Sequence, residues 1–199
     1  MNCVLILILI VLAVVAYRFY NKAKMLEREQ DESQLGHGSR QLESDDGART
    51  VRTIRLHDIV CYLGQDYMVE GVLRYDDDGW PWVTYMLVDG EDVRWLSVED
   101  DDKLEVSLWE QISCPILDEP PEMIEAEGIR FRMVERGEAR VTQQGQTGKR
   151  QGLHVDYFDY ESDGEEMLSV ERWGSEIEVS MGREIDPYGL DIFPGTDVG

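Results

Sequence analysis

The sequence predicts an all-β soluble part made of two tandem five-stranded repeats, barrel-like or sandwich-like, preceded by one N-terminal transmembrane helix. Three observations lead to this prediction: an uncharged apolar run at the start of the chain, short segments in which apolar and polar residues alternate, and a motif that occurs twice. The predicted parts are a transmembrane helix (1–20), a juxtamembrane helix and flexible linker (21–50), a first β repeat (51–114), a second β repeat (115–195) and a tail (196–199).

Residues 1–20 carry the apolar run, which contains no charged residue before Arg18. A helix of this length is about 30 Å long, which matches the hydrocarbon thickness of a bilayer. Basic residues follow the run at Lys22 and Lys24 and none precedes it, so the positive-inside rule places the N-terminus outside and the soluble part in the cytoplasm. We therefore expect a single-pass protein of the plasma membrane. A cleaved signal peptide is the alternative, but the run lacks a positively charged n-region.

The composition excludes several classes of protein. The 199 residues include 42 acidic and 19 basic ones, for a formal net charge of −23. This charge argues against a nucleic-acid partner, because phosphate contacts need clustered Lys and Arg. The three Cys are too few and too far apart for a disulfide scaffold or a Cys-rich metal site. Zinc, nucleotide-loop and nucleophile-elbow spacings are also missing from the sequence, so we predict no cofactor, no metal and no catalytic residue.

The strands are predicted from period-two patterns. Apolar and polar residues alternate over 104–108 and again over 177–181, which is typical of strands with one buried face. An Asp-Gly turn signal at 78–79 separates two such segments. On this pattern Ser97 and Ser169 are predicted to point outward as surface hydroxyls, and the five Trp are interpreted as core residues. In the first copy the predicted strands are Asp58–Leu63, Tyr67–Tyr75, Val83–Val88, Val93–Val98 and Leu104–Trp109.

An internal duplication sets the number of repeats. The tetrapeptide Leu-Ser-Val-Glu occurs at 96–99 and again at 168–171. The second copy has extra Gly- and Gln-rich residues at 142–152, which we interpret as an inserted hairpin loop. Further matches in the same order around each tetrapeptide are Gly-x-x-aromatic at 64–67 and 128–131, Tyr85 and Tyr157, and Glu-Val-Ser at 105–107 and 178–180.

Two acidic clusters are the candidate binding residues, and each lies at a predicted turn between strands. One interpretation is that they keep the protein soluble and protect exposed β edges. The other is a docking surface for a cationic partner, either a basic protein segment or a polyamine. The clusters consist of Asp76, Asp77 and Asp78, and of Glu99, Asp100, Asp101 and Asp102.

Several motifs over residues 54–195 resemble those of the domain-of-unknown-function 4178 family. They are Gly64-x-x-Tyr67, Trp82-x-x-Tyr85, Trp95–Glu99, Asp156–Tyr160 and Leu168–Trp173. The family has no established activity and no accepted catalytic residues, and it includes membrane-anchored members. Genes of this family often lie beside genes for membrane-stress proteins and spermidine-synthase-like proteins. The resemblance therefore implies a role in envelope-stress or polyamine-linked physiology.

These observations favour a membrane-tethered, non-catalytic interaction or adaptor module on the cytoplasmic face. It would bind the membrane through its N-terminal helix and a basic protein or polyamine through the acidic clusters. One alternative is an enzyme with a site between the two repeats. Another is an exported calcium-dependent binding protein, because residues 159–164 resemble the front of a calcium-binding loop, although Val170 stands where that loop needs a Glu.

Overall fold

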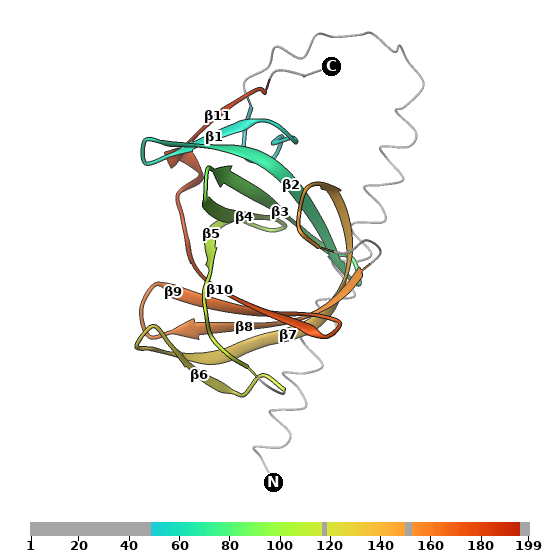
Figure 1. Ribbon diagram of the computed structural model, residues 1–199, viewed down its shortest axis with the longest axis vertical. Helices are drawn as coiled ribbons and strands as arrows, with labels where there is room; N and C mark the ends of the chain where they lie inside the picture. Colours follow the sequence, from blue (N-terminus) through green and yellow to red (C-terminus); the bar gives the residue numbers. More distant parts are fainter. Residues whose placement is uncertain (1–48, 117–118, 150–152, 196–199) are drawn as a thin grey trace. The chain divides into compact units, whose positions relative to one another are not determined.

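The computed structural model describes residues 49–116, 119–149 and 153–195, which form eleven strands and one 3-10 turn, η1 (Pro187–Gly189) (Figure 1). None of these residues forms an α-helix, and no helix among them is long and apolar enough to cross a membrane. The helices predicted within 1–20 and 21–50 fall outside the described residues. The strands are β1 (Ile59–Tyr62), β2 (Gln65–Asp77), β3 (Trp80–Asp89), β4 (Asp92–Asp100), β5 (Leu104–Gln111), β6 (Met123–Ala126), β7 (Ile129–Gly145), β8 (Leu153–Ser162), β9 (Glu166–Trp173), β10 (Glu176–Glu184) and β11 (Leu190–Phe193).

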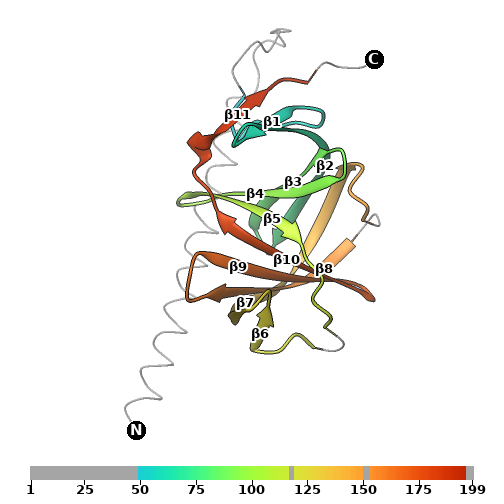
Figure 2. The ribbon, with the colours of Figure 1, turned by 60° about the vertical axis from the view of Figure 1, so that its left-hand side comes forward.

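All the strands belong to one antiparallel sheet, and part of that sheet closes into a barrel. The strand order is β11-β1-β2-β3-β4-β5-β10-β9-β8-β7-β6, and a further pairing joins β2 to β7. Eight strands, β2 to β5 and β7 to β10, therefore form a closed ring, as Figures 1 and 2 show. The strands β1, β6 and β11 lie outside the ring and extend it at two places.

The prediction of two separate five-stranded barrels or sandwiches is wrong. Each repeat supplies five strands, β1 to β5 and β6 to β10, but neither set closes on itself. One seam pairs β5 with β10, where Trp109 lies opposite Gly182, and the other pairs β2 with β7, where Tyr75 lies opposite Val141. Each repeat thus satisfies the edge N–H and C=O groups of the other. Alternation of residues specifies a strand, but it does not specify which strand lies beside it.

The duplicated motifs occupy equivalent positions in the two halves of the sheet. Leu-Ser-Val-Glu lies in β4 and β9, and Glu-Val-Ser lies in the strand beside each, β5 and β10. One match in the alignment is wrong: Leu96 pairs with Tyr85 whereas Leu168 pairs with Tyr160, so Tyr160 and not Tyr157 is the equivalent of Tyr85. The shared register is Glu99–Glu105, Val98–Val106 and Ser97–Ser107 in the first copy, and Glu171–Glu178, Val170–Val179 and Ser169–Ser180 in the second.

Three hairpins turn within two residues, and each needs a left-handed backbone at both. The φ angles are 51° and 82° at Leu63-Gly64, 49° and 98° at Asp78-Gly79, and 52° and 79° at Glu127-Gly128. Positive φ at both central residues is the geometry of type I′ turns, which match the twist of the flanking strands. The first and third turns begin β2 and β7, so the Gly-x-x-aromatic matches at 64–67 and 128–131 are structurally equivalent.

Each repeat has an apolar core on the outer face of the ring. In the first, Val69, Leu87 and Leu96 are fully buried against residues of the N-terminal segment, β1 and β11. In the second, Phe131 and Leu168 are fully buried against β6 and the connection that precedes it. Flanking segments therefore cover the apolar face of each half, and the opposite face of the same strands lines the inside of the ring.

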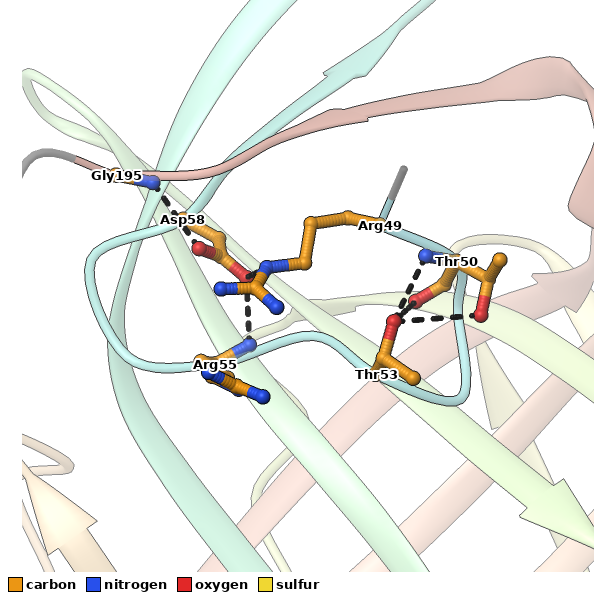
Figure 3. A network of polar contacts seen from close by, with 6 residues as sticks. All are labelled: Arg49, Thr50, Thr53, Arg55, Asp58 and Gly195. Atoms are coloured by element: carbon orange, nitrogen blue, oxygen red, sulfur yellow. Dashed lines mark hydrogen bonds and ion pairs between the residues drawn. The ribbon is translucent and has the colours of Figure 1, made fainter. Parts of the chain in front are cut away.

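A buried carboxylate ties the two ends of the described chain together (Figure 3). Asp58 is 2% exposed and accepts hydrogen bonds from the backbone N–H of Arg55 at 2.8 Å and of Gly195 at 3.0 Å. Arg49 Nε forms an ion pair with the same carboxylate at 3.2 Å. A charge buried to this degree requires such partners, so Asp58 fixes the segment 49–58 against Gly195, two residues after the end of β11.

Substituting Gly71 tests the β2–β7 seam. Gly71 pairs with Gly145, and a Cβ there would stand 2.7 Å from the backbone oxygen of Gln146 and 2.8 Å from Thr147 Cγ2. We expect Gly71→Ala to lower the free energy of unfolding by about 1–3 kcal/mol, measured by urea denaturation, because the backbone of 146–147 must move. Gly189→Ala is the control, since a Cβ there meets nothing within 4 Å. Equal stability of the two variants would contradict the close approach.

Candidate functional site

Aromatic side chains fill part of the inside of the ring and contact one another across it. The ring centroids of Trp82 in β3 and Tyr157 in β8 lie 5.5 Å apart. Those of Tyr75 in β2 and Trp173 in β9 lie 6.2 Å apart. Neither pair of strands is adjacent in the ring, so these contacts cross its inside. Tyr75 also stacks on Trp82 at 4.6 Å. Ring strands from both repeats build this third apolar cluster, of Leu73, Tyr75, Ala139, Val141, Val155, Tyr157 and Trp173, with Trp82 and Trp95 packed against it.

Polar side chains line the rest of the inner face, which can be traced because residues directly opposite each other on paired strands share a face. Ser97 and Ser169, predicted as outward surface hydroxyls, point into the ring instead. Period two separates the two faces of a strand but does not reveal that the polar face is enclosed. Ser97 and Ser169 are only partly buried, so solvent reaches them. The inner carboxylates include Asp77, Glu99, Glu105, Glu135, Asp159, Glu161, Glu171 and Glu178.

The first predicted acidic cluster divides between the inner face and the hairpin tip. Asp77 faces inward and accepts a hydrogen bond from the Tyr157 hydroxyl at 2.7 Å. Asp76 accepts one from the backbone N–H of Gly79 at 2.7 Å and forms an ion pair with Arg140 at 2.6 Å. Asp78 lies in the tight turn itself. The ion pair to Arg140 connects β2 to β7, so Asp76 also supports a seam of the ring.

The second predicted cluster divides in the same way. Glu99 lies on the inner face, opposite Trp82. Asp100 binds the Arg52 guanidinium through both oxygens, at 2.7 and 2.9 Å, while Asp101 and Asp102 are exposed in the β4–β5 turn. Because β2 to β5 form a meander, the two clusters lie at the same end of the sheet. The structure therefore brings Asp77 and Glu99 to one mouth of the ring.

Two carboxylates that the sequence did not single out as a binding site join them from the other repeat. Glu135 lies opposite Asp159, and Asp159 lies opposite Ser169. We call Asp77, Glu99, Glu135 and Asp159 the acidic mouth. Asp159 had been assigned to the calcium-loop motif and Glu135 carried no motif, so only the register of β7 on β8 brings them together.

Burial and neighbouring charges perturb the protonation of this mouth. Burial raises the pKa of Asp159 to about 7, with further contributions from the carboxylates of Glu171, Glu135 and Glu99, while a hydrogen bond with Ser169 acts in the opposite direction. Burial and the Glu105 carboxylate, with smaller contributions from Glu135 and Asp101, raise the pKa of Glu99. Carboxyl groups that lie close together favour the protonated, neutral form because their negative charges repel one another. A bound cation would offset that repulsion, so the mouth would favour a positively charged ligand.

An acidic cleft of about 750 Å³ adjoins the mouth. Glu161, the next inward residue after Asp159 on β8, contributes to its wall. Lys103 Nζ also lines the cleft, between Glu105 at 3.4 Å and Glu184 at 3.2 Å. The lining residues are Lys103, Leu104, Glu161, Ser162, Gly164, Glu165, Glu166, Met167, Glu184, Ile185, Asp186 and Pro187.

The calcium-loop interpretation is not supported. Asp159 and Glu161 lie within β8 and pair with β9, so they do not form a loop around an ion. In residues 49–116, 119–149 and 153–195, no group of three or more His, Cys, Asp or Glu is arranged to hold a metal ion.

A lysine enters the ring at another point. The predicted inserted loop is partly a strand, because 142–145 belongs to β7 and pairs with β2, and Lys149 follows it. The Lys149 side chain is 7% exposed, forms an ion pair with Glu178, and places Nζ 5.0 Å from the centre of the Trp173 ring and 5.6 Å from that of Trp95. The sequence did not predict that Lys149 lies inside the ring. Its only sequence signal was that a basic residue stands in a Gly- and Gln-rich segment of an acidic chain.

The titration of Asp159 gives a testable pH dependence. An acid with a higher pKa in the folded chain binds its proton more tightly when folded, so the free energy of unfolding falls as pH rises from about 4, the unfolded pKa, to about 7. We expect Asp159→Asn to remove this fall and to be more stable than the wild type above pH 7, by up to about 4 kcal/mol. Urea denaturation from pH 4 to pH 8 measures it. The exposed Asp101→Asn removes one charge as a control, and an equal effect in both variants would refute the assignment.

The comparisons with known proteins agree with the resemblance noted in the sequence. Residues 55–187 match the family model described as Domain of unknown function (DUF4178). Uncharacterized proteins of Mycobacterium tuberculosis and Mycobacterium bovis are each 32% identical to the chain over 148 residues, which cover 70% of this chain and 71% of each relative. No solved structure gives a significant match. On this similarity the chain belongs to the DUF4178 family.

Proposed function

We propose that this protein is a non-catalytic binding module that takes an aliphatic polyamine at the acidic mouth. The observation that carries the proposal is the convergence of four inward carboxylates, Asp77 and Glu99 from the first repeat and Glu135 and Asp159 from the second. Burial, and to a smaller extent the carboxylates of Glu171, Glu135 and Glu99, raise the pKa of Asp159 to about 7, so its negative charge is poorly stabilised. A bound polycation would stabilise that charge.

The shape of the site favours a slender cation over a folded basic protein. The carboxylates of Asp159 and Glu99 face the inside of the ring, and the adjoining cleft continues the acidic lining past Glu161 to Glu184. A linear polyamine carries several ammonium groups along one chain and can contact carboxylates at both places. A basic protein segment is the competing ligand that the experiment must separate.

Binding of spermidine provides the test. We expect isothermal titration calorimetry to show saturable binding that strengthens from pH 6 to pH 8, because Asp159 loses its proton near pH 7, and that weakens with added salt. The double variant Asp159→Asn/Glu99→Gln should weaken binding at least about tenfold, which corresponds to about 1.4 kcal/mol.

The charge-matched control is Asp78→Asn/Asp101→Asn, in which both residues belong to the hairpin tips. Equal weakening in the two double variants would mean that diffuse surface charge, and not the mouth, attracts the ligand. Binding of an oligolysine peptide without binding of spermidine would favour a basic protein partner.

An enzyme is a second candidate, favoured by one observation. A carboxyl group whose pKa lies near 7 is suited to general acid–base catalysis, and Asp159 has that property in a partly buried site. Mass spectrometry of the ligand recovered after incubation separates the two candidates. Unchanged ligand supports a binding module, and a converted ligand supports an enzyme.

We further propose that the module is attached to the plasma membrane through the apolar segment 1–20, with the barrel on the cytoplasmic face. The support is the sequence alone, namely the uncharged run and the basic residues that follow it. An adaptor role in envelope-stress or polyamine-linked physiology would follow from holding the binding site near membrane partners.

Cell fractionation tests the attachment. We expect the full chain to sediment with membranes, to resist extraction by high salt and by alkaline carbonate, and to be released by detergent, because about 20 apolar residues anchor a chain firmly. A variant without residues 2–20 should remain in the supernatant. Release of the full chain by salt alone would contradict the proposal.

A further inference from the structure

The surroundings of the Lys149 ammonium resemble a binding site more than a surface ion pair. Nζ lies 5.0 Å from the centre of the Trp173 ring and 5.6 Å from that of Trp95, and it forms an ion pair with Glu178. Cation–π contacts of this kind are strongest where the cation is removed from water, and the side chain is 7% exposed. We call Trp95, Trp173 and Glu178 the Lys149 cage.

The cage belongs to the sheet, whereas the lysine does not. Trp95 lies in β4, Trp173 in β9 and Glu178 in β10, so both repeats contribute and the strand pairings hold each residue in place. The indole N–H of Trp173 also donates a hydrogen bond to Glu171 at 2.9 Å. Lys149 lies in the segment after β7, outside any strand. The cage would therefore keep its shape if the lysine side chain left it.

The cage holds more acceptor groups than one ammonium uses. Glu171 lies beside it and accepts a hydrogen bond from the Tyr75 hydroxyl at 3.1 Å. Burial raises the pKa of Glu171, although the positive charge of Lys149 and the hydrogen bonds from Trp173 and Tyr75 act in the opposite direction. Two carboxylates and two indole faces thus surround a site that now holds one positive charge on a four-carbon arm.

We propose that the Lys149 cage is a binding site for a primary alkylammonium group and that Lys149 occupies it until such a ligand displaces the side chain. Like the lysine side chain, the ligand carries an ammonium group on an aliphatic chain. Its ammonium group would make cation–π contacts with Trp95 and Trp173 and form an ion pair with Glu178. This inference adds a second binding point inside the ring to the proposed function. It rests on the proposed function in one respect, that the natural ligand is a cation.

The experiment uses the full chain and n-propylammonium, which replaces the atoms that Lys149→Ala removes beyond Cβ. We expect Lys149→Ala to bind this probe at least about tenfold more tightly than the wild type, because in the wild type the probe must displace a tethered competitor. Tryptophan fluorescence and calorimetry report the binding. Adding Glu178→Gln to Lys149→Ala should weaken it by about tenfold.

Three controls separate a ligand site from an internal counter-ion. Lys103→Ala removes a lysine that also contacts two carboxylates but is 66% exposed, and it should not gain binding. Lys149→Met keeps an uncharged arm in the cage and should not bind the probe. Neutral n-propanol should not bind Lys149→Ala. A folded Lys149→Ala variant that binds the probe no better than Lys103→Ala does, or that binds n-propanol equally well, would overturn the proposal.

The wild type provides a readout that does not depend on the folding of a variant. It should show saturable binding of n-propylammonium at a concentration about tenfold higher than Lys149→Ala requires, and no saturable change would overturn displacement. In Asp159→Asn/Glu99→Gln, adding Lys149→Ala should still tighten probe binding at least about tenfold, since Trp95, Trp173 and Glu178 are unchanged. Failure of the mouth and failure of the cage are therefore distinguishable.

Discussion

Two strand pairings between the repeats, β2 with β7 and β5 with β10, determine the rest of the structure. Each repeat alone is an open sheet whose edge backbone groups need partners. When the seams form, one apolar face of each half remains outside the ring under β1, β6 and β11, and the opposite faces, which carry the inner aromatic cluster and the polar side chains, line the inside of the ring. The acidic mouth and the Lys149 cage both take residues from the two halves, so neither exists before closure.

The sequence predicted the local structure well because local structure depends on neighbouring residues. The five strands expected in the first copy correspond to β1 to β5, and the Asp-Gly signal at 78–79 is a type I′ turn. The architecture was predicted wrongly because closure depends on which edges meet, and edge pairing leaves no trace in the alternation of residues. For the same reason Ser97 and Ser169 were assigned to the surface.

The candidate site could be predicted only in part. Asp77 and Glu99 belonged to visible acidic clusters, but Glu135 and Lys149 became part of the interior through pairings between distant segments. Other members of the clusters serve the fold. Asp100 binds Arg52, which holds the N-terminal segment, and Asp76 pairs with Arg140 across a seam. Composition cannot separate such carboxylates from those that line the inside of the ring.

The network around Asp58 has a consequence for how the chain can be rearranged. Because Arg49 and Gly195 both contact one carboxylate, the first and last described segments lie within the span of a short linker. A circular permutant that joins them and opens the exposed Gly90-Glu91 turn would keep every strand pairing of the ring. Synthesis would then begin with β4 and end with β3, so the first repeat would be made in two separate pieces without altering the interior that the strands enclose.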